Sequence, residues 1–198
     1  MPSTMVHLMV AHEMKPDASG LFWVGNFAPD YTNDRELKDR IHLRNSDDRW
    51  ASLEKLFFEI NIENEFEYGY FIHLFADACW DKNQLIQHKN WYESIHSESK
   101  ENWFLKYREE IGILTYHLYH HLPWADEIWH LIKDAQIGGI STSLPISIHE
   151  LELYRDRVVS KHSESNPDQV PSFFSVADVM EFSQTTADRL KKWIAPYS

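Results

Sequence analysis

The sequence has 198 residues, 43% of them hydrophobic and 14% aromatic, and a formal net charge of -12. This length can bury a large core, and we expect a single domain over residues 1–198. The acidic balance argues against binding of duplex nucleic acid, which needs a basic surface. With a single cysteine, Cys79, and no apolar run near the roughly 20 residues of a membrane span, we expect a cytoplasmic protein without a transmembrane segment.

Apolar residues recur at helical spacing along nearly the whole chain, and no segment alternates with the period of two that strands show. The first predicted helix covers residues 4–15, between the capping residues Ser3 and Thr4 and Pro16. Further helices are predicted at residues 35–45 (or an irregular turn), from a cap at Asp47 or Asp48 to residue 60, and at 63–82, 84–96, 100–121, 124–135, 146–160 and 176–194. Polar loops are expected at residues 25–34, 138–145 and 162–172. The sequence therefore predicts an all-α protein, a compact multi-helix bundle.

The segment GYFIHLFADACWD, residues 69–81, places charged groups inside an apolar helix. His73, Asp77 and Asp81 follow one another at intervals of four and so lie on one helix face. Burying a charge without a partner is unfavourable, and a metal ion is one partner that offsets it. Imidazole and carboxylate suit zinc, manganese or iron, and this spacing lets His73 and Asp77 reach one ion. Taken alone, the pair is more simply explained by a hydrogen bond.

Three residues nearer the amino terminus extend the candidate set of ligands. His7 lies in the apolar segment VHLMVAHEM, Asp30 ends the segment GNFAPD, and His42 lies in RIHLRN. Considered singly, each has an ordinary explanation: a hydrogen-bonded core histidine, a turn residue and a surface histidine. Their order along the chain, ahead of the helical His73 and Asp77, is what favours a shared site.

This order resembles the zinc-dependent phospholipase C family and the related single-strand-specific zinc nucleases. In those enzymes an early histidine, a loop aspartate, a second histidine and a helical His-x-x-x-Asp occur in the same order. The matching segments are VHLMVAHEM, GNFAPD, the IH of RIHLRN and YGYFIHLFADACW, all within residues 1–82. The resemblance implies a helical bundle of the phospholipase C and zinc nuclease type.

The resemblance also implies roles for these residues. Asp30, His42, His73 and Asp77 would form one metal site, and His7 would join a bridging Asp77 at a neighbouring ion. The amino-terminal tryptophan ligand of those enzymes is missing from a chain that begins MPST, unless processing exposes one. The ligands for their third ion also have no match, because Asn83 stands where a further histidine is expected. We therefore expect one or two ions, zinc first, with manganese or iron as alternatives.

The remaining polar residues have several interpretations. Asp81, His12 and Glu13 are candidates to orient a ligating imidazole. The HLYHH segment, with His117, His120 and His121, would bind metal or phosphate, or interact with the carboxyl-terminal end of a helix dipole. Ordinary surface or interface positions are expected for His88, His96, His130, His149 and His162. Cys79 is expected to pack in the core.

A metal ion lowers the pKa of bound water from about 16 towards ~7, which supplies hydroxide at neutral pH. Asp30 is the candidate catalytic residue that orients or deprotonates this water. The sequence thus predicts a metal-dependent hydrolase, a phosphoesterase acting on a small phosphoester or phospholipid-like substrate. Two alternatives stay open: a non-catalytic helical binding protein with a vestigial metal site, and an HD-type phosphohydrolase. The second lacks its hallmark, because no His-Asp dipeptide occurs in the chain.

Overall fold

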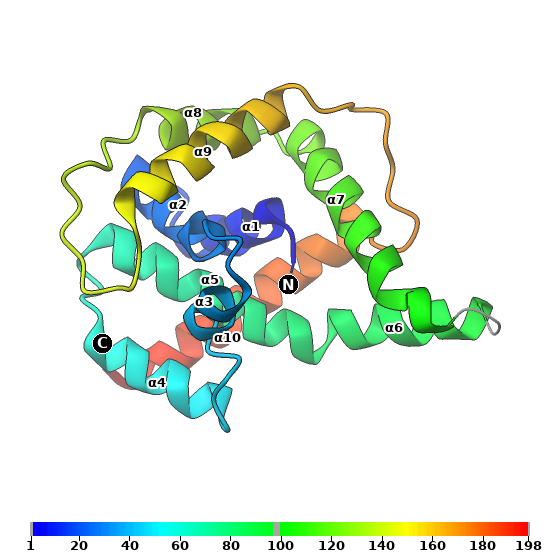
Figure 1. The fold of residues 1–198 in the computed structure, drawn as a ribbon, viewed down its shortest axis with the longest axis horizontal. Helices are drawn as coiled ribbons and strands as arrows, with labels where there is room; N and C mark the ends of the chain where they lie inside the picture. Colours follow the sequence, from blue (N-terminus) through cyan, green and yellow to red (C-terminus); the bar gives the residue numbers. More distant parts are fainter. Residues whose placement is uncertain (1, 97–99, 198) are drawn as a thin grey trace.

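The computed structural model describes residues 2–96 and 100–197 (Figure 1). All regular secondary structure within these residues is helical, which confirms the all-α prediction. The α-helices are α1 (Thr4–Met14), α2 (Gly20–Phe27), α3 (Arg35–Ile41), α4 (Arg49–Glu59), α5 (Glu65–Lys82), α6 (Gln84–Ile95), α7 (Trp103–His121), α8 (Ala125–Asp134), α9 (Ile148–Ser163) and α10 (Val176–Ile194). Short 3-10 turns occur at η1 (Ala28–Asp30), η2 (Lys100–Asn102) and η3 (Ala195–Tyr197).

The capping residues explain where several helices begin. The Ser3 side chain accepts a hydrogen bond from the Val6 amide, and the Asp48 carboxylate accepts from the amides of Trp50 and Ala51. These contacts satisfy donors that would otherwise be unpaired in a first helical turn. The predicted starts after Ser3 and at Asp48 are therefore confirmed.

Helix α2 lies where the sequence predicts no helix, and it extends into the expected loop at residues 25–34. Gly25 to Phe27 are helical, and Ala28 to Asp30 continue as the 3-10 turn η1. Only eight residues long, α2 is too short for its periodicity to be recognised and too short to be stable alone. Its packing against α5 stabilises it, and this long-range contact is invisible in a local pattern.

Two glycines bring the backbones of α2 and α5 unusually close. A Cβ atom added at Gly25 would lie 2.0 Å from the Phe66 carbonyl oxygen, and one added at Gly69 would lie 2.1 Å from that of Phe22. Only glycine fits at either position. The close approach lets the side-chain amide of Asn26 donate a hydrogen bond to the Gly69 carbonyl at 3.2 Å. It also places Asn26 next to the face of α5 that carries the predicted ligands.

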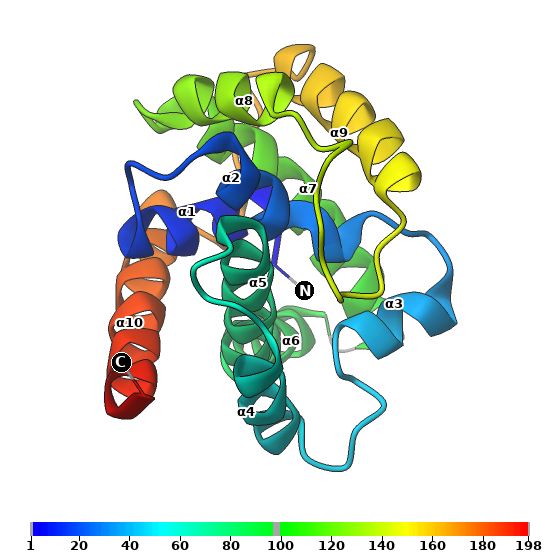
Figure 2. The same ribbon diagram turned by 90° about the vertical axis from the view of Figure 1, so that its left-hand side faces the viewer.

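Helix α5 runs through the middle of the molecule, with α8 and α9 above it and α4 below it in the view of Figure 2. Helix α1 packs against α5, α2, α7 and α10, so its segment from Met5 to Ala11 is buried all round. Helix α3 and the turn after it lie beside α5 on the side away from α10 (Figure 2). Among the described residues, no helix combines the length and apolarity needed to cross a membrane.

Candidate metal centre

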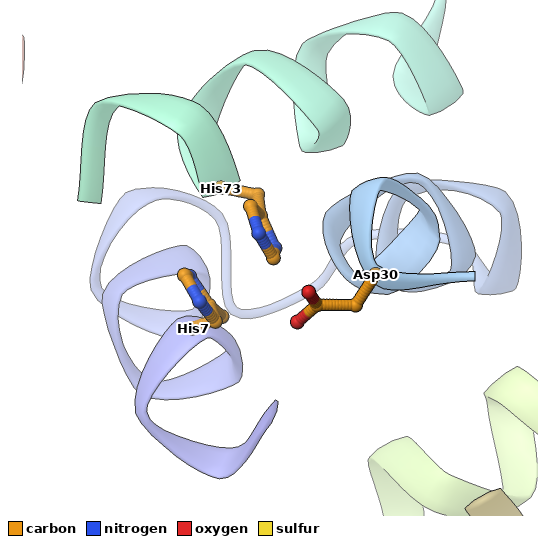
Figure 3. Close-up of side chains that lie close together, drawn as sticks. All are labelled: His7, Asp30 and His73. Atoms are coloured by element: carbon orange, nitrogen blue, oxygen red, sulfur yellow. The ribbon is translucent and has the colours of Figure 1, made fainter. Parts of the chain in front are cut away.

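The structure brings together the five side chains proposed as ligands. His7 comes from α1, Asp30 ends η1, His42 caps the end of α3, and His73 and Asp77 lie one turn apart on α5. Figure 3 shows His7, Asp30 and His73 pointing toward one another from three separate elements. The side chain of Asp30 is 12% exposed, whereas the other four are completely buried.

Two backbone carbonyls orient two of the imidazole rings. His73 Nδ1 lies 2.6 Å from the Asn26 carbonyl oxygen, and His42 Nδ1 lies 2.7 Å from that of Lys38. Because a carbonyl only accepts, each Nδ1 carries the hydrogen and each neutral ring keeps its lone pair on Nε2. These two Nε2 atoms face each other at 3.3 Å. Two lone pairs at this distance require a cation or a shared proton between them.

Carboxylate oxygens surround the same point. His42 Nε2 lies 3.5 Å from Asp30 Oδ1 and 3.6 Å from Asp77 Oδ2. The side chains form two groups whose potential ligand atoms all lie within 4.8 Å of one another. One group is His7, Asp30 and His73, and the other is His42, His73 and Asp77. The two groups share His73, whose single available nitrogen can coordinate only one ion.

His7 is held by stacking rather than by hydrogen bonds. Its ring lies on that of His73, with centroids 3.6 Å apart and planes 9° apart. His7 Nε2 is 3.4 Å from Asp77 Oδ1, but neither ring nitrogen, nor that oxygen, has a hydrogen bond of acceptable geometry to any described residue. Buried polar atoms are nearly always paired, so the arrangement favours a partner other than a protein side chain.

The protonation states suit metal coordination. Burial acts to raise the pKa of Asp30, but contact with His42 and the charge of Lys38 outweigh it and hold this pKa well below its usual value. The pKa of Asp77 is likewise well below its usual value, because the neighbouring imidazoles outweigh the effect of burial. Burial, reinforced by His7, keeps the pKa of His73 well below its ordinary value. Ionised carboxylates and a neutral imidazole are the forms that bind metals.

Cationic side chains contact the cluster where it nears solvent. Lys38 Nζ lies 2.8 Å from Asp30 Oδ1. Arg44 and Arg49 each direct one Nη2 atom at Asp77 Oδ2, at 3.1 and 3.5 Å. Sequence reasoning missed all three residues. The closeness of Lys38 and Arg44 to His42 along the chain was the available signal, and nothing local indicated Arg49.

A strained turn sets the directions of His42 and Arg44. Helix α3 ends in a Schellman motif, in which the Arg44 amide donates to the Asp39 carbonyl at 2.9 Å and the Leu43 amide to that of Arg40 at 3.1 Å. Leu43 has φ 57°, a left-handed conformation that usually requires glycine. Strained backbone of this kind is enriched at functional sites.

The expected orienting side chains have other partners. His12 stacks on Trp124 with ring centroids 4.4 Å apart, and Glu13 is exposed. Asp81 Oδ2 pairs with Arg49 Nη1 at 2.9 Å. The orientation of His42 and His73 by backbone carbonyls replaces the expectation that a side chain would do so. A carbonyl is positioned by the path of the chain, which the sequence does not display.

The remaining histidines divide into three groups. At the end of α7, His121 Nδ1 contacts the His117 carbonyl at 2.7 Å, as the helix-end interpretation expects. His117 and His120 instead contact the loop after α9, through the Gln169 carbonyl at 3.1 Å and the Ser165 hydroxyl at 2.9 Å. His88 and His162 are buried in the core, which corrects their expected surface or interface positions. The exposed positions of three others are confirmed: His96, His130 and His149. Cys79 is buried, as expected of a packing residue.

Comparison with protein-family models, with curated protein sequences and with solved structures finds no match to this chain.

Proposed function

We propose that this protein is a metal-dependent hydrolase that cleaves phosphoester bonds. The observation that carries the proposal is the pair of Nε2 atoms of His42 and His73, which face each other at 3.3 Å while both Nδ1 atoms contact backbone carbonyls. A proton on His73 Nε2 is disfavoured, because burial holds the pKa of His73 well below its ordinary value. A divalent cation satisfies both nitrogens.

The separations fit zinc. With Zn–N bonds of about 2.0–2.1 Å and tetrahedral angles, two ligand atoms lie about 3.3–3.4 Å apart. The distances from His42 Nε2 to His73 Nε2, Asp30 Oδ1 and Asp77 Oδ2 are 3.3, 3.5 and 3.6 Å. His42, His73 and Asp77, whose ligand atoms all lie within 4.8 Å of one another, supply three donors, the number usual at catalytic zinc. His7 and Asp77 Oδ1 supply two donors towards a second ion, fewer than the three protein ligands usual at catalytic zinc. We therefore expect one tightly bound ion, with manganese or iron as alternative occupants.

Within this centre we assign a separate role to each side chain. A divalent ion bound there would acidify water and polarise a phosphoryl oxygen. Asp30, the one partly exposed member, can accept a hydrogen bond from an attacking water. Because its pKa is so low, Asp30 is better suited to orienting that water than to taking its proton. His42, His73 and Asp77 hold the ion, while His7 packs on His73 and keeps the ring in place.

The surroundings and the sequence order support a phosphoester as the substrate. Lys38, Arg44 and Arg49 give the centre a cationic border in a protein of net charge -12. The order of His7, Asp30, His42, His73 and Asp77 also resembles that of zinc-dependent phospholipases C and zinc nucleases. The acidic remainder of the molecule favours a small soluble phosphoester over a long nucleic acid.

A non-catalytic helical binding protein is the second candidate, favoured by one observation. The ion pairs of Lys38 with Asp30 and of Arg44 with Asp77 already neutralise part of the carboxylate charge, as they would in a centre that no longer needs a metal. Such a relic would take up no metal, or would take up metal without hydrolysing substrates.

Metal content separates these possibilities first. We expect elemental analysis of zinc-reconstituted protein to find about one zinc ion per chain, and both His73→Ala and Asp77→Ala to abolish uptake. The exposed His96 provides the control, His96→Ala, which should retain zinc. Folding is checked by far-UV circular dichroism. Hydrolysis of an aryl phosphodiester that chelator stops and zinc restores would support the enzyme; full zinc occupancy in both motif variants would refute the assignment of ligands.

A further inference from the structure

We propose that Arg44 and Arg49 form a binding site for a phosphoryl oxyanion beside the metal centre. The inference rests on the proposed function and defines which groups would hold the substrate's charged oxygens.

The two guanidinium groups converge on one carboxylate oxygen. Arg44 Nη2 lies 3.1 Å and Arg49 Nη2 3.5 Å from Asp77 Oδ2. The carboxylate is completely buried, whereas the Arg44 and Arg49 side chains are 27% and 17% exposed. The arginines thus lie between a proposed metal ligand and the solvent, where a bound oxyanion would have to sit.

Both arginines have donors to spare. A guanidinium carries five N–H groups in a planar fork that matches two oxygens of a phosphate. Arg49 Nε is buried, and no described residue accepts a hydrogen bond from it. When Asp77 shares its charge with a metal ion, its attraction for the arginines weakens, so their Nη atoms become better donors to an incoming anion.

The charge balance has the right sign for an anion. Among the described residues, three carboxylates at the centre, Asp30, Asp77 and Asp81, pair with three cations, Lys38, Arg44 and Arg49, so a divalent ion would make this group positive by two charges. Asp39, which also contacts Arg44, is balanced by its ion pair with Arg35. In a protein of net charge -12, this local excess is what would attract a phosphoryl group.

The backbone holds Arg44 in position. Its side chain follows the left-handed Leu43, so the strained turn that points His42 at the centre also points Arg44 at Asp77. Arg44 Nη1 additionally lies 3.5 Å from Asp39 Oδ1 on α3. A guanidinium fixed from two sides loses little entropy when it binds an anion.

The test is a calorimetric titration of inorganic phosphate into zinc-loaded protein. We expect wild-type protein to bind phosphate and Arg44→Gln to bind it at least about tenfold more weakly, a loss typical of one charge-assisted contact. Arg44→Lys keeps the charge but loses the fork, and should recover only part of the affinity. Arg35→Gln is the matched control, because it removes the same charge from an α3 side chain that is 96% exposed, and it should bind as wild type does.

Zinc content and circular dichroism are measured on every sample, so the two proposals fail separately. Wild-type protein without zinc would refute the metal centre and this inference together. Zinc-loaded wild type that binds no phosphate, or Arg44→Gln with full zinc and unchanged affinity, would overturn the oxyanion site alone. Arg49→Gln serves as the second variant if Arg44→Gln does not fold, with the same loss of affinity expected and the same result overturning the inference.

Discussion

At the scale of single residues, the placement of one hydrogen atom decides the chemistry of His73. Because its Nδ1 contacts the Asn26 carbonyl at 2.6 Å, its Nε2 lone pair points at His42 and the carboxylates. His162 is a buried histidine with the opposite role. Its Nδ1 contacts the Val158 carbonyl at 2.8 Å, and its ring packs on Trp129 with centroids 4.2 Å apart. The first arrangement leaves Nε2 available for a cation, whereas in the second Nε2 lies 3.4 Å from the Thr115 hydroxyl and the ring packs in the core.

His162 should make folding stability depend on pH. Burial lowers its pKa from 6.5 to about 4, so the unfolded chain binds more protons between these values. Its stabilising effect is complete above about pH 6.5 and is lost as the pH falls towards 4. At about 1.4 kcal/mol per pKa unit, the loss is on the order of 3 kcal/mol.

Urea unfolding at pH 7 and pH 4.5 tests this effect. We expect His162→Asn, whose amide can still donate to Val158, to reduce the difference in unfolding free energy between the two pH values. His130→Asn is the control, because His130 Nδ1 makes the same contact four residues back, at 2.7 Å from the Asp126 carbonyl, on an exposed side chain. Equal pH dependence in wild type and His162→Asn would contradict the prediction.

At the scale of elements, the contact between α2 and α5 positions the residues on one side of the centre. The glycines at positions 25 and 69 let the two backbones touch, and this contact carries the Asn26 carbonyl to His73. The end of α3 acts in the same way, because its left-handed Leu43 turns His42 and Arg44 towards α5. Gly25, Gly69 and Leu43 supply no ligand atom themselves, yet each one positions a ligand.

Gly69→Ala should therefore destabilise the fold. The new Cβ would lie 2.1 Å from the Phe22 carbonyl oxygen, so a backbone must move. Overpacking of this kind costs roughly 2 kcal/mol or more, measurable by chemical denaturation. The same substitution at Gly112, in the middle of α7 with open space around it, should stabilise the protein by about 0.5–1 kcal/mol. A stable Gly69→Ala variant with wild-type zinc content would show that the close approach is not required.

At the scale of the whole molecule, the proposed ion would join the end of α3 to α5, with Asp30 of η1 and His7 of α1 beside it. These elements are spread over residues 4–82 of the chain, and no disulfide links them. An ion that binds only the folded chain stabilises it by mass action. The centre is thus expected to contribute to folding as well as to catalysis.

Thermal unfolding measures this contribution. At a free zinc concentration one hundred times Kd, binding adds about 2.7 kcal/mol, which corresponds to about 5–10 °C in Tm for a chain of this size. Chelator should reverse the increase, and His73→Ala should show none. An identical Tm with and without zinc in the wild-type protein would count against the centre.

The sequence by itself determined the helical class, most helix boundaries and the candidate ligands. Those features follow from short-range physics: apolar periodicity places the helices, capping residues begin them, and a spacing of four puts His73 and Asp77 on one face. Only the tertiary structure decided that His7, Asp30 and His42 reach them, that α2 is a helix, and that Arg44 and Arg49 border the centre. Each of these depends on two segments touching at a distance in the chain, through the glycine contact of α2 with α5 and the turn at Leu43. A local pattern contains no information about such contacts.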